Sequence, residues 1–258
     1  MKAIRDFRER PSLGNGCCRF CYSARPSVAA TRGFRAGRQT GTAVTPGVGI
    51  LGGTFDPIHY GHLRMADEVG AALGLAQVRL IPAGNPYHRP ADAPLTPSLQ
   101  RLAMARLGVI EFPRLTVDPR EALRSEPSYT IDTLTALREE LDSTPLLLLL
   151  GADTFATLPT WKRWLELFAL AHVVVVARPG HAPAEPLQSP LAGVFAARRI
   201  EDPVLLSSGA GRIYEQMITP QPISATQVRA TVRAGRRLDG MVPRAVMEYI
   251  ETHSLYRT

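Results

Sequence analysis

Hydrophobic runs alternate with amphipathic segments along the chain from residue 48 onward. Apolar segments of strand length lie at 48–51, 78–82, 115–118, 146–151, 172–177 and 212–217. Apolar positions recur at helical spacing near 62–73, 97–109, 130–141, 161–170, 224–234 and 243–253. Strands that alternate with helices predict a parallel sheet covered on both faces, because each connection between parallel strands crosses over as a helix. We therefore expect an α/β fold, a doubly wound, Rossmann-like parallel sheet of about five to six strands.

The chain divides into two parts by composition. Residues 1–45 are basic and show no helical or strand periodicity, so we expect a disordered leader. Residues 46–258 are expected to form the α/β domain, with a small helical part at about 222–258. Within the domain, 178–204 is rich in Pro, Ala and Gly and predicts a long surface excursion to which the sequence assigns no role.

The net charge of +7 of the 258 residues lies entirely in the leader. Residues 1–47 hold nine Lys or Arg against two acidic residues, whereas 48–258 hold 21 of each sign. The domain is therefore neutral, and its charge gives no reason to expect a nucleic-acid partner. No apolar run is long enough to span a membrane. The three cysteines, Cys17, Cys18 and Cys21, lie in the leader and are one ligand short of a zinc site. The domain has no cysteine and therefore no disulfide, which fits an expected location in the reducing cytoplasm.

A glycine-rich stretch follows the first expected strand. Residues 52–62 read Gly-Gly-Thr-Phe-Asp-Pro-Ile-His-Tyr-Gly-His, and a helix is expected from about residue 60. The first N–H groups of a helix lack internal partners and carry the positive end of its dipole, so they favour phosphate. His59 and His62, three residues apart, can face that anion together, although such a pair is also compatible with a structural or metal-binding role. Neither the Walker loop nor the dinucleotide fingerprint is present.

A second polar segment begins the helix expected at 224–234. Ser224 is a suitable N-cap, Thr226 adds a hydroxyl, and Arg229 adds a guanidinium just over one turn into the helix. These groups can take phosphate oxygens, or they can simply cap a surface helix.

The two segments resemble the signatures of a known family. Gly-Thr-Phe-Asp-Pro-Ile-His-Tyr-Gly-His at 53–62 resembles the motif of the HxGH nucleotidyltransferases, and Ile-Ser-Ala-Thr-Gln-Val-Arg at 223–229 resembles their second motif. Over 48–258 the chain resembles the bacterial nicotinate-nucleotide adenylyltransferases. Two motifs about 165 residues apart and in the right order are more specific than either alone. The resemblance implies transfer of AMP from ATP to nicotinate mononucleotide, which gives deamido-NAD and pyrophosphate in NAD biosynthesis.

The resemblance implies an ATP side of the site. His59, His62 and Arg229 are the expected catalytic residues, which stabilise charge at the α-phosphate without a general base or a covalent intermediate. The expected ATP-binding residues are Gly52, Gly53, Thr54, Phe55, His59, His62, Arg178, Ser224, Thr226 and Arg229. Mg2+ is expected to be bound mainly through the ATP phosphates, and no carboxylate cluster requires a protein-bound metal.

The resemblance also implies an acceptor side for nicotinate mononucleotide. Its expected residues are Arg89, Tyr129, Thr130, Asp153 and Trp161. Arg89 would clamp the phosphate, Asp153 the ribose hydroxyls, and Trp161 would stack on the pyridine ring. From the residues alone, Arg89 can be a solvated loop arginine, Asp153 an N-cap and Trp161 a core residue.

Specificity for an acid over an amide needs fixed donors. Backbone N–H groups near Thr130 and Lys162, at expected helix starts, could select a pyridine carboxylate over a neutral carboxamide, while Trp164 is assigned to packing.

Three alternative functions remain: phosphopantetheine adenylyltransferase, nicotinamide-mononucleotide adenylyltransferase, and a nucleotide-sensing or RNA-binding protein that uses the basic leader. The sequence leaves the oligomeric state open.

Overall fold

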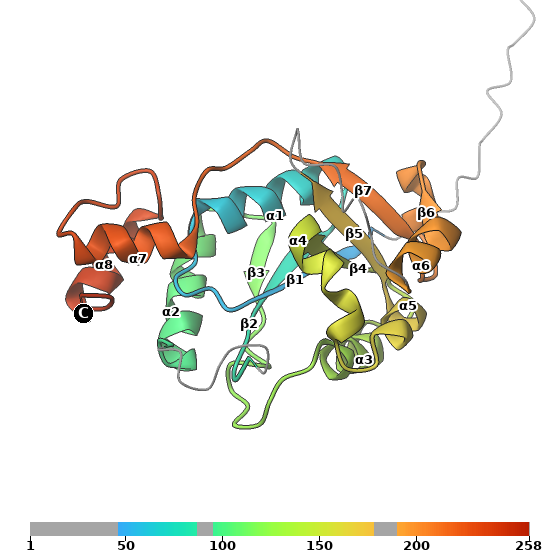
Figure 1. Cartoon of the computed structure of the whole chain (residues 1–258), viewed down its shortest axis with the longest axis horizontal. Helices are drawn as coiled ribbons and strands as arrows, with labels where there is room; N and C mark the ends of the chain where they lie inside the picture. Colours follow the sequence, from blue (N-terminus) through green and yellow to red (C-terminus); the bar gives the residue numbers. More distant parts are fainter. Residues whose placement is uncertain (1–45, 87–94, 178–189, 258) are drawn as a thin grey trace, which may run out of the picture. The chain divides into compact units, whose positions relative to one another are not determined.

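Seven parallel strands form one sheet in the computed structural model, which describes residues 46–86, 95–177 and 190–257 (Figure 1). The strands are β1 Val48–Gly53, β2 Gln77–Pro82, β3 Leu115–Val117, β4 Leu146–Gly151, β5 His172–Ala177, β6 Arg199–Ile200 and β7 Ile213–Met217. Their order across the sheet is β3-β2-β1-β4-β5-β7-β6. The predicted parallel α/β sheet is confirmed, with all six expected strands in place. The seventh strand, β6, has two residues and is too short to leave a pattern in the sequence.

Helices connect the strands and complete the carboxyl-terminal part. They are α1 Tyr60–Ala72, α2 Ser98–Gly108, α3 Thr130–Leu141, α4 Ala152–Ala156, α5 Leu167–Leu170, α6 Leu191–Arg198, α7 Ala225–Arg233 and α8 Arg244–Thr252. Short 3-10 helices span Val109–Glu111, Leu158–Thr160, Trp164–Glu166 and Pro203–Leu206. Among the described residues, no helix is long and apolar enough to cross a membrane.

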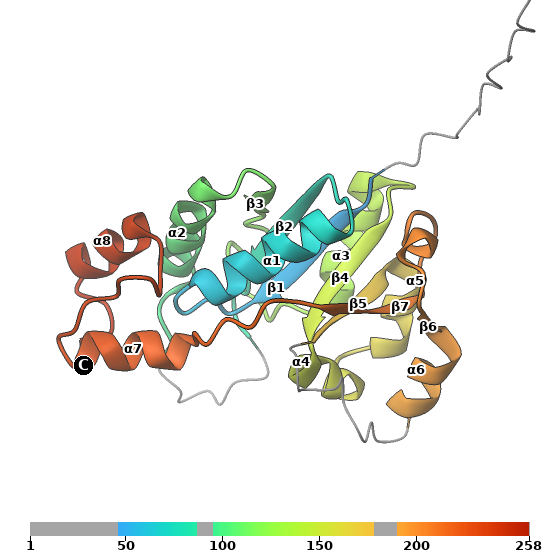
Figure 2. The ribbon, with the colours of Figure 1, turned by 90° about the horizontal axis from the view of Figure 1, so that it is seen from above.

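Two hydrophobic cores lie on opposite faces of the sheet. Helices α1, α2, α7 and α8 contribute to one core, and α3, α4, α5 and α6 contribute to the other (Figure 2). In β4, Leu147 and Leu149 point into the first core, whereas Leu148 points into the second. Because both faces are buried, the strand reads as an unbroken apolar run rather than as an alternating one.

The order in which the chain adds strands to the sheet reverses between β1 and β4, although all strands remain parallel. From β1 the chain adds β2 and then β3 on one side, and β4, β5 and β7 extend the sheet on the other. Val48 pairs in parallel with Gln77 of β2 and with Leu146 of β4. In open parallel sheets, ligands bind outside the carboxyl ends of the strands where the order reverses. The loop after β1 and helix α4 after β4 lie at that position.

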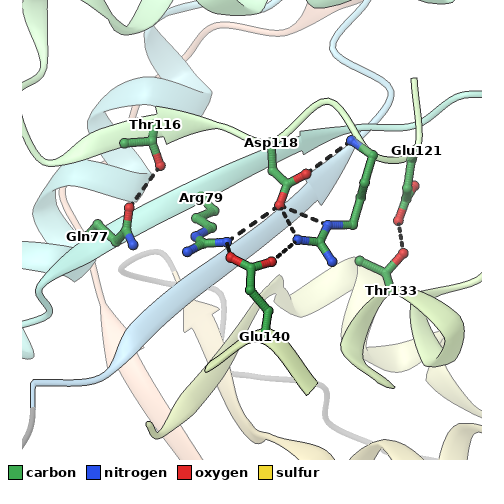
Figure 3. Close-up of polar contacts among 8 residues, drawn as sticks. Gln77, Arg79, Thr116, Asp118, Glu121, Thr133 and Glu140 are labelled. Atoms are coloured by element: carbon green, nitrogen blue, oxygen red, sulfur yellow. Dashed lines mark hydrogen bonds and ion pairs between the residues drawn. The ribbon is translucent and has the colours of Figure 1, made fainter. Parts of the chain in front are cut away.

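An ion network fixes α3 against the edge of the sheet at β2 and β3 (Figure 3). Glu140 of α3 accepts hydrogen bonds from Arg79 and Arg120, both at 2.6 Å. Asp118 accepts from the Arg120 Nε at 2.8 Å. Burial alone would raise the pKa of Asp118, but the bonds from Arg120 and the charges of both arginines hold it below its usual value.

Two expectations about local structure were wrong or incomplete. Residues 161–170 do not form one helix, because Arg163 adopts a left-handed conformation with φ of 53°, and the chain continues as the 3-10 helix Trp164–Glu166 and the short α5. The expected excursion at 178–204 contains α6 and β6 over its described residues, and a 3-10 helix, Pro203–Leu206, begins at its end. Residues 1–45, including the three cysteines, lie outside the described residues.

Candidate active site

The loop after β1 wraps around the side chain of Phe55. Phe55 is 2% exposed, and a Cβ added at Gly53 would approach its ring to within 2.7 Å. The ring also meets His62 edge to face, with centroids 5.0 Å apart. Phe55 has a left-handed backbone with φ of 48°, which the surrounding packing must stabilise. Its side chain therefore shapes the loop, and only its backbone remains for a ligand.

The two imidazoles of the first motif stack on each other. Their centroids lie 3.8 Å apart with 25° between the planes, and His59 is buried while His62 is partly exposed. The pKa of His62 lies well below its ordinary value because burial disfavours the charged ring and because charge on His59 would repel it. His62 is therefore neutral at pH 7, and its Nδ1 has no hydrogen-bond partner among the described residues.

Arg229 joins the second motif to the first. Its Nη1 donates to the carbonyl oxygen of Asp56 at 2.7 Å, and its Nη2 donates to the Thr226 hydroxyl at 3.3 Å. At Gly61 an added Cβ would lie 2.8 Å from the His59 ring and 3.0 Å from the Ile223 carbonyl. Only glycine fits between them, so the histidine loop and the start of the second motif lie in direct contact.

The N–H groups at the start of α1 were expected to be free to bind phosphate. Two of them are not free. The N–H of Tyr60 donates to the Met241 carbonyl at 3.0 Å, and that of His62 donates to the His59 carbonyl at 3.0 Å. Met241, in the segment between α7 and α8, thus supplies an acceptor for the first N–H of α1. A buried N–H without a partner would be costly. These two N–H groups are therefore already bonded within the chain.

The N-cap role of Ser224 is confirmed. Its hydroxyl accepts from the N–H of Gln227 at 3.2 Å, and the Gln227 side chain accepts from the N–H of Ser224 at 2.8 Å. This reciprocal capping box fixes the start of α7 and with it the position of Arg229.

Tyr256 is a part of the site that the sequence did not indicate. Its hydroxyl donates to Oδ1 of the buried Asp56 at 2.6 Å. Burial and this bond raise the pKa of Tyr256 far above its ordinary value, so the hydroxyl stays protonated and remains a donor. The carboxyl-terminal tail thereby holds the same residue whose carbonyl Arg229 contacts, and no local pattern in the sequence predicts that contact.

The acceptor-side segments lie at the carboxyl ends of β2 and β4. Asn85, after β2, forms a parallel bridge with Pro127, which leads into α3. Thr130 is the first residue of α3, as expected, and Tyr129 precedes it. Lys162 Nζ lies 4.0 Å from the centre of the Tyr129 ring.

The structure excludes the N-cap alternative for Asp153 and the expected helix start at Lys162. Asp153 is exposed in the first turn of α4 and does not cap it, since the N-cap is Gly151. Lys162 does not begin a helix, contrary to expectation, because the turn at Arg163 intervenes.

The two tryptophans differ in their surroundings. Trp161 is partly exposed and packs against the second core, which also receives Tyr129. Trp164 packs on Phe168, with ring centroids 6.3 Å apart, as its assignment to packing predicted. Arg89 and Arg178 lie outside the described residues.

Metal ligands do not gather in the described part of the chain. No group of three or more His, Cys, Asp or Glu side chains there is placed to hold a metal ion.

The chain is similar in sequence to a known family and to several named proteins. The cytidylyltransferase-like family model matches residues 50–231. The chain is 47% identical over 211 residues to a probable nicotinate-nucleotide adenylyltransferase of Pseudomonas aeruginosa (strain UCBPP-PA14), covering 81% of this chain and 97% of that protein. A relative of the same name from Pseudomonas putida (strain W619) is 48% identical over 211 residues, with 81% and 94% covered.

Solved structures show the same fold at lower identity. Nicotinic acid mononucleotide adenylyltransferase of Plasmodium falciparum, complexed with NaAD, matches with a TM-score of 0.60 at 18% identity, covering 82% of this chain and 97% of that one. The same enzyme complexed with APC matches with a TM-score of 0.59 at 17% identity.

Proposed function

The chain belongs to the cytidylyltransferase-like family and, within it, to the nicotinate-nucleotide adenylyltransferases, and we propose that it transfers AMP from ATP to nicotinate mononucleotide. The observation that carries the proposal is the hydrogen bond from Arg229 to the Asp56 carbonyl at 2.7 Å. It joins the two motifs at the carboxyl end of β1, where an open parallel sheet binds nucleotides.

In the reaction, a phosphate oxygen of the mononucleotide forms a bond to the α-phosphorus of ATP while the bond to pyrophosphate breaks. The attacking phosphate is already anionic at neutral pH, so no base is needed, and alignment with charge stabilisation supplies the catalysis. His62, as a neutral ring, and His59 donate to phosphate oxygens. Arg229 adds a fixed positive charge, held in place by Asp56 and Thr226.

Magnesium fits this site only as a companion of ATP. The described residues offer no carboxylate cluster for it, so phosphate oxygens and water would hold the ion, as is usual for Mg2+. When bound, it would neutralise charge on the departing pyrophosphate.

On the acceptor side, Trp161 stacks on the pyridine ring and Asp153 binds the ribose hydroxyls. Two observations support the ribose role of Asp153: its side chain is exposed, and it does not cap α4. The start of α3 at Thr130 provides N–H groups and a positive dipole end for the pyridine carboxylate. Arg89 would bind the phosphate.

A pyrophosphate-release assay on the full chain tests the function. With ATP as donor, we expect turnover with nicotinate mononucleotide, weaker turnover with nicotinamide mononucleotide and none with phosphopantetheine. Absence of turnover with both mononucleotides would refute the proposal, and turnover with phosphopantetheine alone would establish the main rival.

A further inference from the structure

Arg101 of α2 is a fully buried arginine, at 0% exposure, that lies between two loops of the site. Its Nη1 donates to the Thr54 carbonyl at 2.6 Å, its Nη2 to the Gly84 carbonyl at 2.8 Å and its Nε to the Thr96 carbonyl at 2.8 Å. Hydrogen bonds from a charged donor are about twice as strong as neutral ones. One guanidinium therefore holds the backbone of three separate segments.

Two of these segments belong to opposite sides of the proposed reaction. Thr54 opens the loop that carries the histidines, and Gly84 follows β2 directly before Asn85. The loops also bond to each other, since the N–H of Ala83 donates to the Gly53 carbonyl at 2.9 Å. Asn85 in turn bridges to Pro127 on the way into α3. Arg101 thus links the ATP-side loop to the acceptor-side loop.

The connection continues from Gly84 to the start of α3. A Cβ added at Gly84 would lie 2.1 Å from the Glu121 carbonyl, so the two backbones are in tight contact. The buried Glu121 carboxylate accepts a hydrogen bond from Thr133 Oγ1 of α3 at 2.6 Å (Figure 3). Ser98, one turn before Arg101, donates to the Ala122 carbonyl at 2.8 Å. A shift of Gly84 would therefore move the first turn of α3.

Given the adenylyl transfer proposed above, we propose that Arg101 is a positioning residue that sets the distance between the bound ATP and the bound mononucleotide. It touches neither substrate and acts through the backbone of Thr54 and Gly84. In-line transfer between two substrates is sensitive to alignment, and a displacement of about 1 Å can reduce the rate about 100-fold. A change in that distance leaves each substrate's own contacts in place, so the effect appears in kcat more than in either KM.

Arginine is suited to this task and lysine is not. A guanidinium is a planar fork whose N–H groups point in fixed directions, whereas an ammonium is a point charge at the end of a flexible stem. Arg101→Lys keeps the charge but cannot hold three carbonyls in one plane. The substitution therefore separates the positioning role from a need for positive charge.

Arg138 provides a matched control. It also donates to three backbone carbonyls, those of Asp142, Thr144 and Leu170. These lie at the end of α3, before β4 and at the end of α5, away from the carboxyl edge of the sheet. Arg138→Lys should cost stability by the same mechanism without moving either substrate loop.

The test compares the full-length variants by melting temperature and steady-state kinetics, well below either melting temperature. We expect Arg101→Lys to lower kcat at least about tenfold while each KM changes less than about threefold. Arg138→Lys should keep kcat within about twofold of the parent. Parental kcat in Arg101→Lys, or an equal loss in both variants, would overturn the positioning role. If the parent itself shows no turnover, the proposed function fails instead.

Hydrogen exchange on the parent chain decides the matter if Arg101→Lys does not fold. A non-hydrolysable ATP analogue should slow exchange in 53–56 and also in 83–86, because Arg101, together with the bond from Ala83 to Gly53, makes the loops respond together. Protection confined to 53–56 would contradict the inference. This measurement requires binding but no turnover, so its result is independent of the acceptor's identity.

Discussion

The ATP side and the acceptor side of the candidate site are built differently. On the ATP side, Asp56 is 3% exposed and His59 is 4% exposed, and Arg229 and Tyr256 both hold Asp56. On the acceptor side, Asp153 is exposed and lies on a helix of five residues. The comparison teaches that the groups proposed to stabilise the transition state are fixed before ligand binds. Those proposed to bind the acceptor are an exposed carboxylate, a partly exposed tryptophan and the start of α3, which meet the ligand by direct contact.

The largest expected effect comes from breaking the ATP side. His62→Ala should reduce turnover by about 100-fold, and by no less than about tenfold, because it removes a donor from the charge that develops in the transition state. The free energy of unfolding should fall only modestly, because the ring loses its contacts with His59 and Phe55 but no hydrogen bond of its Nδ1. Turnover and thermal melting of the variant check both points. A folded, fully active variant would remove His62 from the mechanism.

A smaller, selective effect is expected on the acceptor side. Trp161→Leu should raise the KM for nicotinate mononucleotide about tenfold and leave the KM for ATP unchanged, because stacking on a base is worth about 1–3 kcal/mol. Trp164→Leu is the control three residues away. It loses packing on Phe168 and should lower the melting temperature without changing either KM. If both variants had the same KM values, Trp161 would be a packing residue like its neighbour.

The tail contact of the ATP side gives a weaker effect again. Tyr256→Phe removes the donor to Asp56 and should destabilise the fold by about 1–3 kcal/mol, since a buried acceptor loses a bond. The KM for ATP should rise about threefold because the Arg229 anchor loosens. Tyr249→Phe serves as the control, since Tyr249 stacks on His253 in the same carboxyl-terminal part. Equal kinetic constants in the two variants would show that the tail only stabilises.

The smallest expected effect is on the pH dependence of stability. The pKa values of His62 and His172 are both lowered, chiefly by burial. The unfolded chain therefore takes up protons first as the pH falls through the ordinary value of 6.5, and the free energy of unfolding should fall with it. Denaturant unfolding from pH 7.5 to about 5.5 measures the slope.

Two variants separate the contributions of His172 and His62 to the pH dependence of the free energy of unfolding. His172→Gln removes a ring at the start of β5, whose Nε2 lies 3.1 Å from the Ser208 carbonyl, and should flatten part of the slope with turnover unchanged. His62→Ala should flatten another part and lose turnover. A slope unaffected by both substitutions would place the titration elsewhere.

Elements with contiguous patterns could be predicted from the sequence. The strands from β1 to β5 read directly as apolar runs, and Ser224 was identified as an N-cap from its position before a periodic segment. The two motifs also indicated their own proximity, because each follows a strand or begins a helix at the carboxyl edge. Local chemistry was sufficient in these cases.

Long-range contacts could not be predicted in this way. Met241 bonds the first N–H of α1, Tyr256 bonds Asp56, and Arg101 joins Thr54 to Gly84. Each partner lies far away in the chain, and an arginine or tyrosine on a helical pattern gives no sign of what it will reach. The left-handed turn at Arg163 was missed for a related reason, since arginine rarely adopts that conformation.

A crystal structure of the full chain with a non-hydrolysable ATP analogue tests most directly whether the two motifs bind one triphosphate. The account predicts phosphate oxygens within about 3.2 Å of a His62 ring nitrogen and of the Arg229 guanidinium in the same complex. A triphosphate that contacts only one of them, or that lies away from the carboxyl end of β1, would contradict the account.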